Sequence, residues 1–184
     1  MPAAVNITET DLRTALRGFL LSVVGDLYEV VKGQDNRVAM PEGRFITMTG
    51  LNNDELNKPY STWQDSGQPA GGLELTNQAK KWICQLDVYG EDAGSTASTI
   101  FTLARSGYAV RQFAELTKDK GFSVIPLYAD QPHQTTMING EKQYEERWTL
   151  DLHLQFNLVI STPMEFAAEL YVKPASVDAT FPPE

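Results

Sequence analysis

The segment from Trp148 to Ile160 restricts the fold of this 184-residue chain more than any other part of its sequence. Apolar and polar residues alternate along it, and a period of two places all the apolar side chains on one face of a β-strand. We therefore expect an antiparallel strand that buries this face in the core and leaves its polar face in solvent. The apolar positions are Trp148, Leu150, Leu152, Leu154, Phe156, Leu158 and Ile160.

The predicted strand is also long. At about 3.3 Å per residue it would span roughly 40 Å, more than twice the length of an ordinary strand. We expect it to extend beyond its own sheet and to expose backbone groups that a neighbouring subunit covers. Head-to-tail contacts of this kind, repeated around an axis, can close into a ring.

The other periodic segments predict a fold of the α/β (α+β) class. One helix is expected from Leu12 to about Leu27, with Thr8 and Asp11 forming a capping box at its start. Together the segments predict a mixed, mainly antiparallel sheet packed by two or three helices, in a single domain over residues 1–184. The other expected elements are strands at Arg44–Thr49, Leu73–Tyr89, Phe122–Tyr128 and Phe166–Val172, and helices from Ala97 to about Leu116 that break near Ser106 and Gly107.

Three segments lack such a pattern. Residues 50–72 are rich in Asn, Pro and Gly and are expected to form a long loop, in which Tyr60 and Trp63 either dock a partner or pin the loop to its own domain. Residues 130–143 are expected to form a hairpin arm, because they contain residues suited to a tight turn. The tail at residues 174–184 ends in prolines and is expected to be flexible.

The charge of the chain argues against DNA or membrane binding. With 24 acidic and 15 basic residues its net charge is -9, so its surface repels phosphate and anionic lipid. Such a surface suits a protein that lets DNA pass without binding it, and equally a cytosolic protein kept soluble by charge. No apolar run reaches the roughly 20 residues of a membrane helix, and the N-terminus lacks a signal peptide. We expect synthesis and assembly in the cytoplasm.

The residues that usually carry chemistry form no recognisable site. The only cysteine, Cys84, is expected with Trp82, Leu86 and Val88 on the buried face of a strand, where a thiol is inert, and Gln85 and Asp87 are expected on the other face. His133 and His153 have no metal-ligand spacing around them. His153 has Asp151 and Gln155 as expected same-face neighbours, which we interpret as cross-strand polar pairing because no nucleophile accompanies them. There is also no glycine-rich phosphate loop. The chain is therefore expected to be no enzyme and to need no metal and no cofactor.

One part of the sequence resembles a known family. The segment from Pro126, Leu127 and Tyr128, through the turn-rich residues 130–140, to Tyr144, Arg147 and Trp148 is similar to the phage neck or tail terminator proteins of tailed bacteriophages. The similarity also includes the N-terminal amphipathic helix and the final strand. The candidate assembly contacts that follow from the loops and this segment are Tyr60, Trp63, His133, Met137, Tyr144 and Arg147.

The resemblance implies a structural virion protein with no catalytic residues. It implies a homo-oligomeric ring of six members at the head-proximal end of the tail. The implied partners are the tail tube protein and the head–tail connector or adaptor, with the sheath as a further candidate, while genomic DNA passes without specific binding. Two alternatives stay open: another phage morphogenesis protein, such as a head completion protein, stopper or tail tube subunit, or a small cytosolic enzyme or ligand-binding domain. Gene neighbourhood would separate them.

Overall fold

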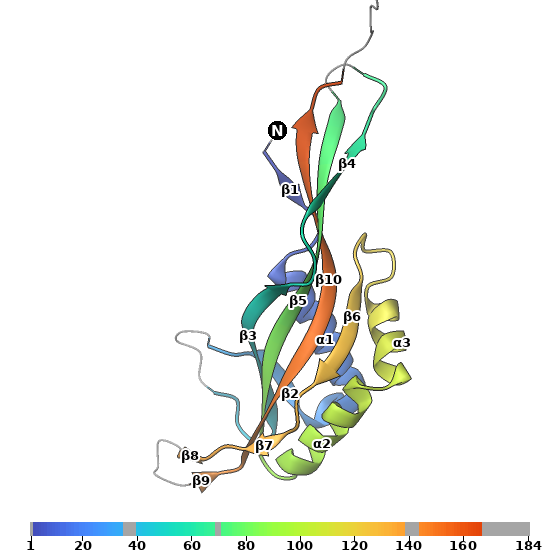
Figure 1. Ribbon diagram of the computed structural model, residues 1–184. Coiled ribbons are helices and arrows are strands. Elements are labelled where there is room, and N and C mark those ends of the chain that lie inside the picture. Colours follow the sequence, from blue (N-terminus) through green and yellow to red (C-terminus); the bar gives the residue numbers. More distant parts are fainter. Residues whose placement is uncertain (1, 35–39, 69–70, 139–143, 167–184) are drawn as a thin grey trace, which may run out of the picture.

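The computed structural model describes residues 2–34, 40–68, 71–138 and 144–166 (Figure 1). It contains three α-helices and one 3₁₀ turn within these ranges, together with strands that lie mostly in one sheet. The helices are α1 (Glu9–Val24), α2 (Ala93–Ala104) and α3 (Gly107–Leu116), and η1 (Gly25–Leu27) follows α1. The strands are β1 (Ala4–Val5), β2 (Glu29–Lys32), β3 (Phe45–Glu55), β4 (Tyr60–Gln64), β5 (Gly72–Tyr89), β6 (Val124–Ala129), β7 (His133–Gln134), β8 (Met137–Ile138), β9 (Tyr144–Glu145) and β10 (Arg147–Met164).

Eight of the strands in the described ranges form one sheet, with the order β1-β10-β5-β3-β2. β4 pairs with β5, and β6 and β7 pair with β10, while β8 and β9 form a separate two-stranded ribbon. The β2–β3 pair is parallel, and the other pairs are antiparallel. This confirms the predicted α+β fold with a mixed, mainly antiparallel sheet packed by helices.

The two longest strands form the spine of the molecule. β10 pairs with β5 without a register shift over its whole length, from Arg147 opposite Tyr89 to Met164 opposite Gly72. The expectation that the long strand outruns its own sheet was therefore wrong. It reaches as far as predicted, but β5 is equally long and satisfies its backbone groups on one side.

The helices cover one face of this sheet, and the core lies between them. The even-numbered side chains in the helix-covered halves of β5 and β10 point into it, and Trp82, Cys84, Leu86 and Val88 are buried as the sequence predicted. α1 begins at the predicted capping box, with Thr8 and Asp11 each bonded to the other's backbone. The core-facing residues of α1 are Leu12, Ala15, Leu16, Phe19, Leu20 and Val24.

The apolar face of β10 divides into two parts. Leu150, Leu152, Leu154 and Phe156 are buried under the helices, whereas Leu158 to Ile160 are only half-buried. The polar face of β10 is not uniformly solvent-exposed either, because Thr149 and His153 are each only 6% exposed. A period of two identifies the two faces of a strand, but which stretch of each is covered depends on other parts of the fold.

The prediction of a long loop at residues 50–72 was wrong. β3 continues through Asn52 and Asn53 to Glu55, and the chain then returns as β4, so both sides of the expected loop are strands. β3 stays extended because it keeps pairing with β5, with a bulge after Gly50 and an ion pair of 2.9 Å between Asp54 and Lys81. Its polar composition reflects exposure and not irregular structure. Residues 69–70 lie outside the described part.

The last part of the sheet to describe is β6 and the region after it. Pro126 lies next to a bulge in β6, a strand that pairs only with β10 in the described residues, and proline within a sheet is confined to such edge or bulge positions. The expected hairpin arm at residues 130–143 contains β7, which pairs with β10, and β8, which pairs with β9. His133, expected in a loop, therefore lies on a short strand. Residues 139–143, most of the strand expected at Phe166–Val172, and the tail at 174–184 lie outside the described residues.

Candidate functional site

Beyond the helices the sheet continues as a narrow ribbon at the top of Figure 1, which we call the arm. It consists of β1, β4 and the distal halves of β5 and β10, residues 4–5, 60–64, 72–79 and 157–164. The helices end short of it, so neither face has a second layer. Residues 73–79 of β5 are all half-buried as a result.

The arm is poor in charge and rich in exposed apolar surface. Glu74 is the single charged residue in the arm of a protein whose net charge is -9. Trp63 is 61% exposed, Tyr60 56% and Val5 54%. Val5 lies opposite Ile160, and Ser61 lies in the same row of residues across the sheet. Trp63 follows Ser61 by two positions on β4, so Val5, Ile160 and Trp63 share one face. An exposed apolar patch of this kind is typical of an interaction site.

The outer edge of β4 strengthens this interpretation. β4 pairs with β5 on one side, and within the described residues no strand pairs with its other side. Soluble proteins usually protect such edges with charged residues or proline, and residues 60–64 contain neither. The arm therefore presents to a partner both apolar side chains and a strand edge that neither charged residues nor proline protect.

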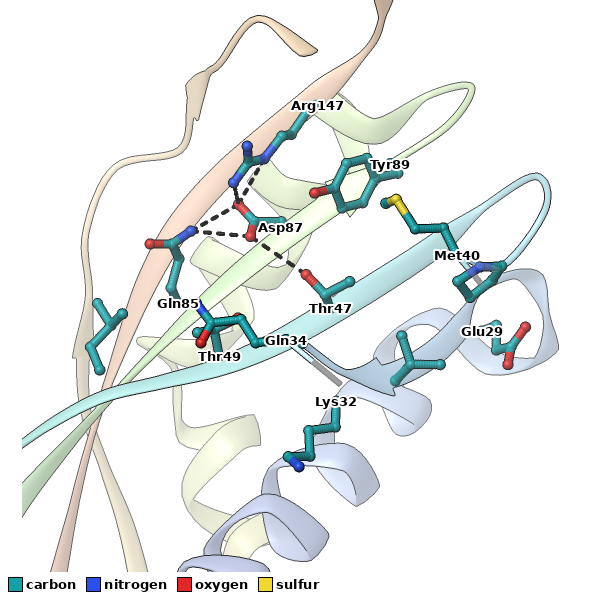
Figure 2. A pocket seen from close by; sticks show the side chains of 14 residues that line it. Glu29, Lys32, Gln34, Met40, Thr47, Thr49, Gln85, Asp87, Tyr89 and Arg147 are labelled. Atoms are coloured by element: carbon teal, nitrogen blue, oxygen red, sulfur yellow. Dashed lines mark hydrogen bonds and ion pairs between the residues drawn. The ribbon is translucent and has the colours of Figure 1, made fainter. Parts of the chain in front are cut away.

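A cavity of about 680 Å³ lies at the other end of β5 and β10, on the face of the sheet turned away from the helices (Figure 2). β2, β3, β5 and the start of β10 form its floor, and Met40 and Pro41 form part of its wall. Val31, Leu51 and Met40 contribute apolar surface, and the last two are each 50% exposed. The cavity thus combines an apolar wall with a polar floor.

The floor of the cavity is centred on Asp87, which is 4% exposed. Its Oδ1 atom accepts hydrogen bonds from Nε and the terminal nitrogen of Arg147, at 3.1 and 2.8 Å, and from the hydroxyl of Thr149 at 2.8 Å. The amide of Gln85 donates to both carboxylate oxygens at 3.1 Å, and Thr47 donates more weakly at 3.5 Å. The buried carboxylate is therefore fully paired, and the floor carries no uncompensated charge.

His153 belongs to a separate polar cluster on the same face. Its Nε2 atom lies 3.1 Å from the carboxylate of Asp130, and its ring stacks on Tyr128 with centroids 4.0 Å apart. Asp151 and Gln155 share the face of His153 on β10 as expected, but the hydrogen bond and the ring contact of His153 go to Asp130 and Tyr128 at the end of β6. Burial, together with the charge of Asp130, raises the pKa of Asp151 above its ordinary value. Nδ1 of His153 is buried without a hydrogen bond in the described residues.

These polar groups do not amount to a catalytic arrangement. Cys84 is fully buried on the helix-covered face, and burial raises the pKa of its thiol well above the ordinary range. In the described ranges, no group of three or more His, Cys, Asp or Glu side chains could hold a metal ion. No helix in the same ranges has both the length and the apolar character needed to span a membrane.

The assembly contacts suggested by the sequence fall into three groups in the structure. Two lie on the arm, one lies in the floor of the cavity, and three lie on the short strands after β6. Their role as contacts stays a prediction. The groups are Tyr60 and Trp63; Arg147; and His133, Met137 and Tyr144.

The cavity itself was not predicted. Asp87 and Gln85 were expected on the exposed face of their strand, and nothing in their spacing indicates that Arg147 and Thr149 converge on them from β10. The sequence does contain one indication, because Arg147 and Thr149 are alternate polar residues on one strand and Gln85 and Asp87 are alternate polar residues on another. Their convergence can be inferred only from the β5–β10 register, which periodicity alone does not provide.

Comparisons with known proteins give the chain a family. The family model described as phage neck terminator protein matches residues 10–177. No curated protein matches the chain. Among solved structures, the sheath/tube terminator of the extracellular contractile injection system PVC, in its extended state, is similar with a TM-score of 0.49 and 12% identity. That match covers 95% of this chain and 64% of the other, so the chain spans less than two thirds of that protein.

The family match includes every helix of the structure except the first residue of α1, and all the strands except β1. It therefore extends over nearly the whole described fold and not over one motif. The chain is a structural component of the phage tail and neck with a tail-terminator role, and it belongs to the phage neck terminator protein family.

Proposed function

We propose that the chain forms a homo-oligomeric ring of six copies. The ring closes the tail tube at its head-proximal end and joins it to the head–tail connector. The observation that carries this proposal is the family match over residues 10–177. The proposed partners are the tail tube protein and the connector or adaptor, with the sheath as a further partner in a contractile tail. Assembly takes place in the host cytoplasm, before or during joining of head and tail.

The distribution of surface in the monomer supports a ring. The arm and the cavity lie at opposite ends of the same two strands, and they differ in shape and composition. A contact between two different patches is head-to-tail, and repetition of such a contact around an axis gives a closed ring when the rotation closes. A symmetric dimer would instead require one self-complementary patch.

The charge of the chain supports passage of DNA through such a ring. A net charge of -9 on each copy, with 15 basic residues against 24 acidic ones, makes the assembly repel phosphate. DNA that moves through the neck must not be held there, so a repulsive lumen suits the role. The proposed role is structural and needs no catalytic step.

A phage that lacks the gene provides the test. We expect its lysates to contain free heads and tails that are abnormal in length or fail to join, and we expect the full chain supplied in trans to restore infectious particles. A conservative change on an exposed helix position, Val110→Ala, serves as the matched control and should complement fully. Normal tails and joined particles without the protein would contradict the proposal.

A further inference from the structure

We infer that the Trp63 face of the arm docks into the cavity of the neighbouring copy, so that Asp87 and Arg147 form the floor of a subunit–subunit contact. This inference rests on the proposed ring and names the two surfaces that meet in it. Its starting point is that one chain carries an apolar projection and an open cavity, and that no other part of the described chain covers either of them.

The arm cannot fill the cavity of its own chain. Both surfaces are carried by β5 and β10, which pair continuously from Gly72 to Tyr89. Trp63 lies opposite Glu74, which is 13 residues from Asp87 on β5, and at about 3.3 Å per residue this places the two surfaces roughly 40 Å apart on paired strands. Among the described residues, the arm of the same chain therefore does not reach the cavity, whereas the arm of a second copy is free to do so.

Charge identifies a second copy as the occupant. Two copies of a chain with a net charge of -9 repel each other over most of their surface. The arm is the region through which a second copy can approach with least repulsion, because Glu74, opposite Trp63 in the register, is its one charged residue. The cavity floor is also compatible with a neutral occupant, because Asp87 is already paired with Arg147 and stays paired after water is displaced.

The dimensions of the two surfaces agree. A cavity of about 680 Å³ lies within the range that accommodates a drug-sized molecule, and a tryptophan with one or two neighbouring apolar side chains is of this size. Val31, Met40 and Leu51 provide an apolar wall, and Tyr89, whose ring stacks on Phe45, also lines the cavity. Tryptophan in a pocket is the usual form of an interface residue that dominates binding.

Thiol cross-linking in phage particles tests this docking. Ser61→Cys places a thiol on the Trp63 face without removing Trp63, and Leu51→Cys places one on the cavity wall. With a short bifunctional thiol reagent, particles that carry both substitutions should yield a ladder of covalent oligomers of this chain. Each single variant should yield none, and Cys84 should not react because it is fully buried. A control pair, Ser61→Cys with Val110→Cys on α3, should also yield none.

The outcomes separate the docking from the proposed ring. If particles contain the chain as a ring but the Ser61 and Leu51 pair gives no more oligomers than the control pair, the docking is wrong and the ring stands. Cross-linking of Ser61→Cys to a different virion protein also overturns the docking. If particles contain the chain in an arrangement other than a ring, the proposed function itself fails.

A second variant covers the case in which the double substitution is not incorporated. Trp63 is 61% exposed, so Trp63→Ala should leave the melting temperature of the free chain unchanged while lowering its incorporation into particles at least tenfold. Val110→Ala should leave both unchanged. Normal incorporation of Trp63→Ala would overturn the docking.

Discussion

Replacing Asp87 by asparagine removes one negative charge from the floor of the cavity while keeping the shape of the side chain. The carboxylate accepts all of its hydrogen bonds from Arg147, Thr149, Gln85 and Thr47. Asparagine keeps one acceptor oxygen, but its amide group would face donors on the other side. The Arg147 guanidinium would also lose its counter-charge.

The size of the effect follows from burial. Hydrogen bonds to a charged group contribute about 1.5–3 kcal/mol each, and breaking a buried ion pair costs about 3–5 kcal/mol. The side chain of Asp87 is 6% exposed but that of Arg147 is 28% exposed, so the guanidinium can turn partly toward water. We therefore expect a loss of about 2–3 kcal/mol in the free energy of unfolding, or roughly 5–10 °C in melting temperature.

Urea and thermal unfolding of the purified chain at neutral pH would measure this loss. Glu91→Gln, which removes an exposed carboxylate that pairs with Arg44, is the control and should not move the midpoint measurably. A double-mutant cycle with Arg147→Gln should show that the two substitutions are not additive, because they remove the same interaction. A loss below about 0.5 kcal/mol for Asp87→Asn would refute the view that this network holds β5, β3 and β10 together.

Three further predictions concern local contacts. Thr8→Ala should lower stability by about 1 kcal/mol in urea unfolding. Hydrogen bonds from Thr8 hold the pKa of Asp11 below its ordinary value, so the Asp11 carboxylate stabilises the fold at pH values above the ordinary carboxyl pKa. The stability difference between Thr8→Ala and the parent chain should therefore shrink as the pH falls through the lowered pKa. Burial raises the pKa of Asp151, so ionisation there costs stability; Asp151→Asn should raise the unfolding midpoint at neutral pH, with no gain below the ordinary carboxyl pKa. The Cys84 thiol should resist a thiol reagent in the native chain and react in urea, and rapid native labelling would contradict its burial.

Local patterns were enough to predict the elements whose residues are covered on one side. The alternation around Leu152 and the capping box at Thr8 both predicted structure correctly, because each depends on neighbours within the same segment. The fold class followed from the order of these elements. The sequence pattern also placed Cys84 in the core, since its strand alternates in the same way.

Features that depend on pairing between distant segments were missed. The second half of β3 and all of β4 were taken for a loop, because an exposed strand has no apolar face to mark it and is recognised only through its pairing with β5. His153 was assigned to a solvent-exposed face because nothing local indicates that Tyr128 and Asp130 cover it. For the same reason Tyr60 and Trp63 were selected for their size in a polar segment, while the arm that presents them was not expected.

A cryo-EM reconstruction of the virion neck tests the central claim most directly. The account predicts density for this chain as a closed ring of six copies at the head-proximal end of the tail, between the tail tube and the connector. It further predicts that the Trp63 face of each arm reaches the cavity around Asp87 in the next copy. Density for this chain at another position in the particle, or in an arrangement other than a closed ring, would contradict the account.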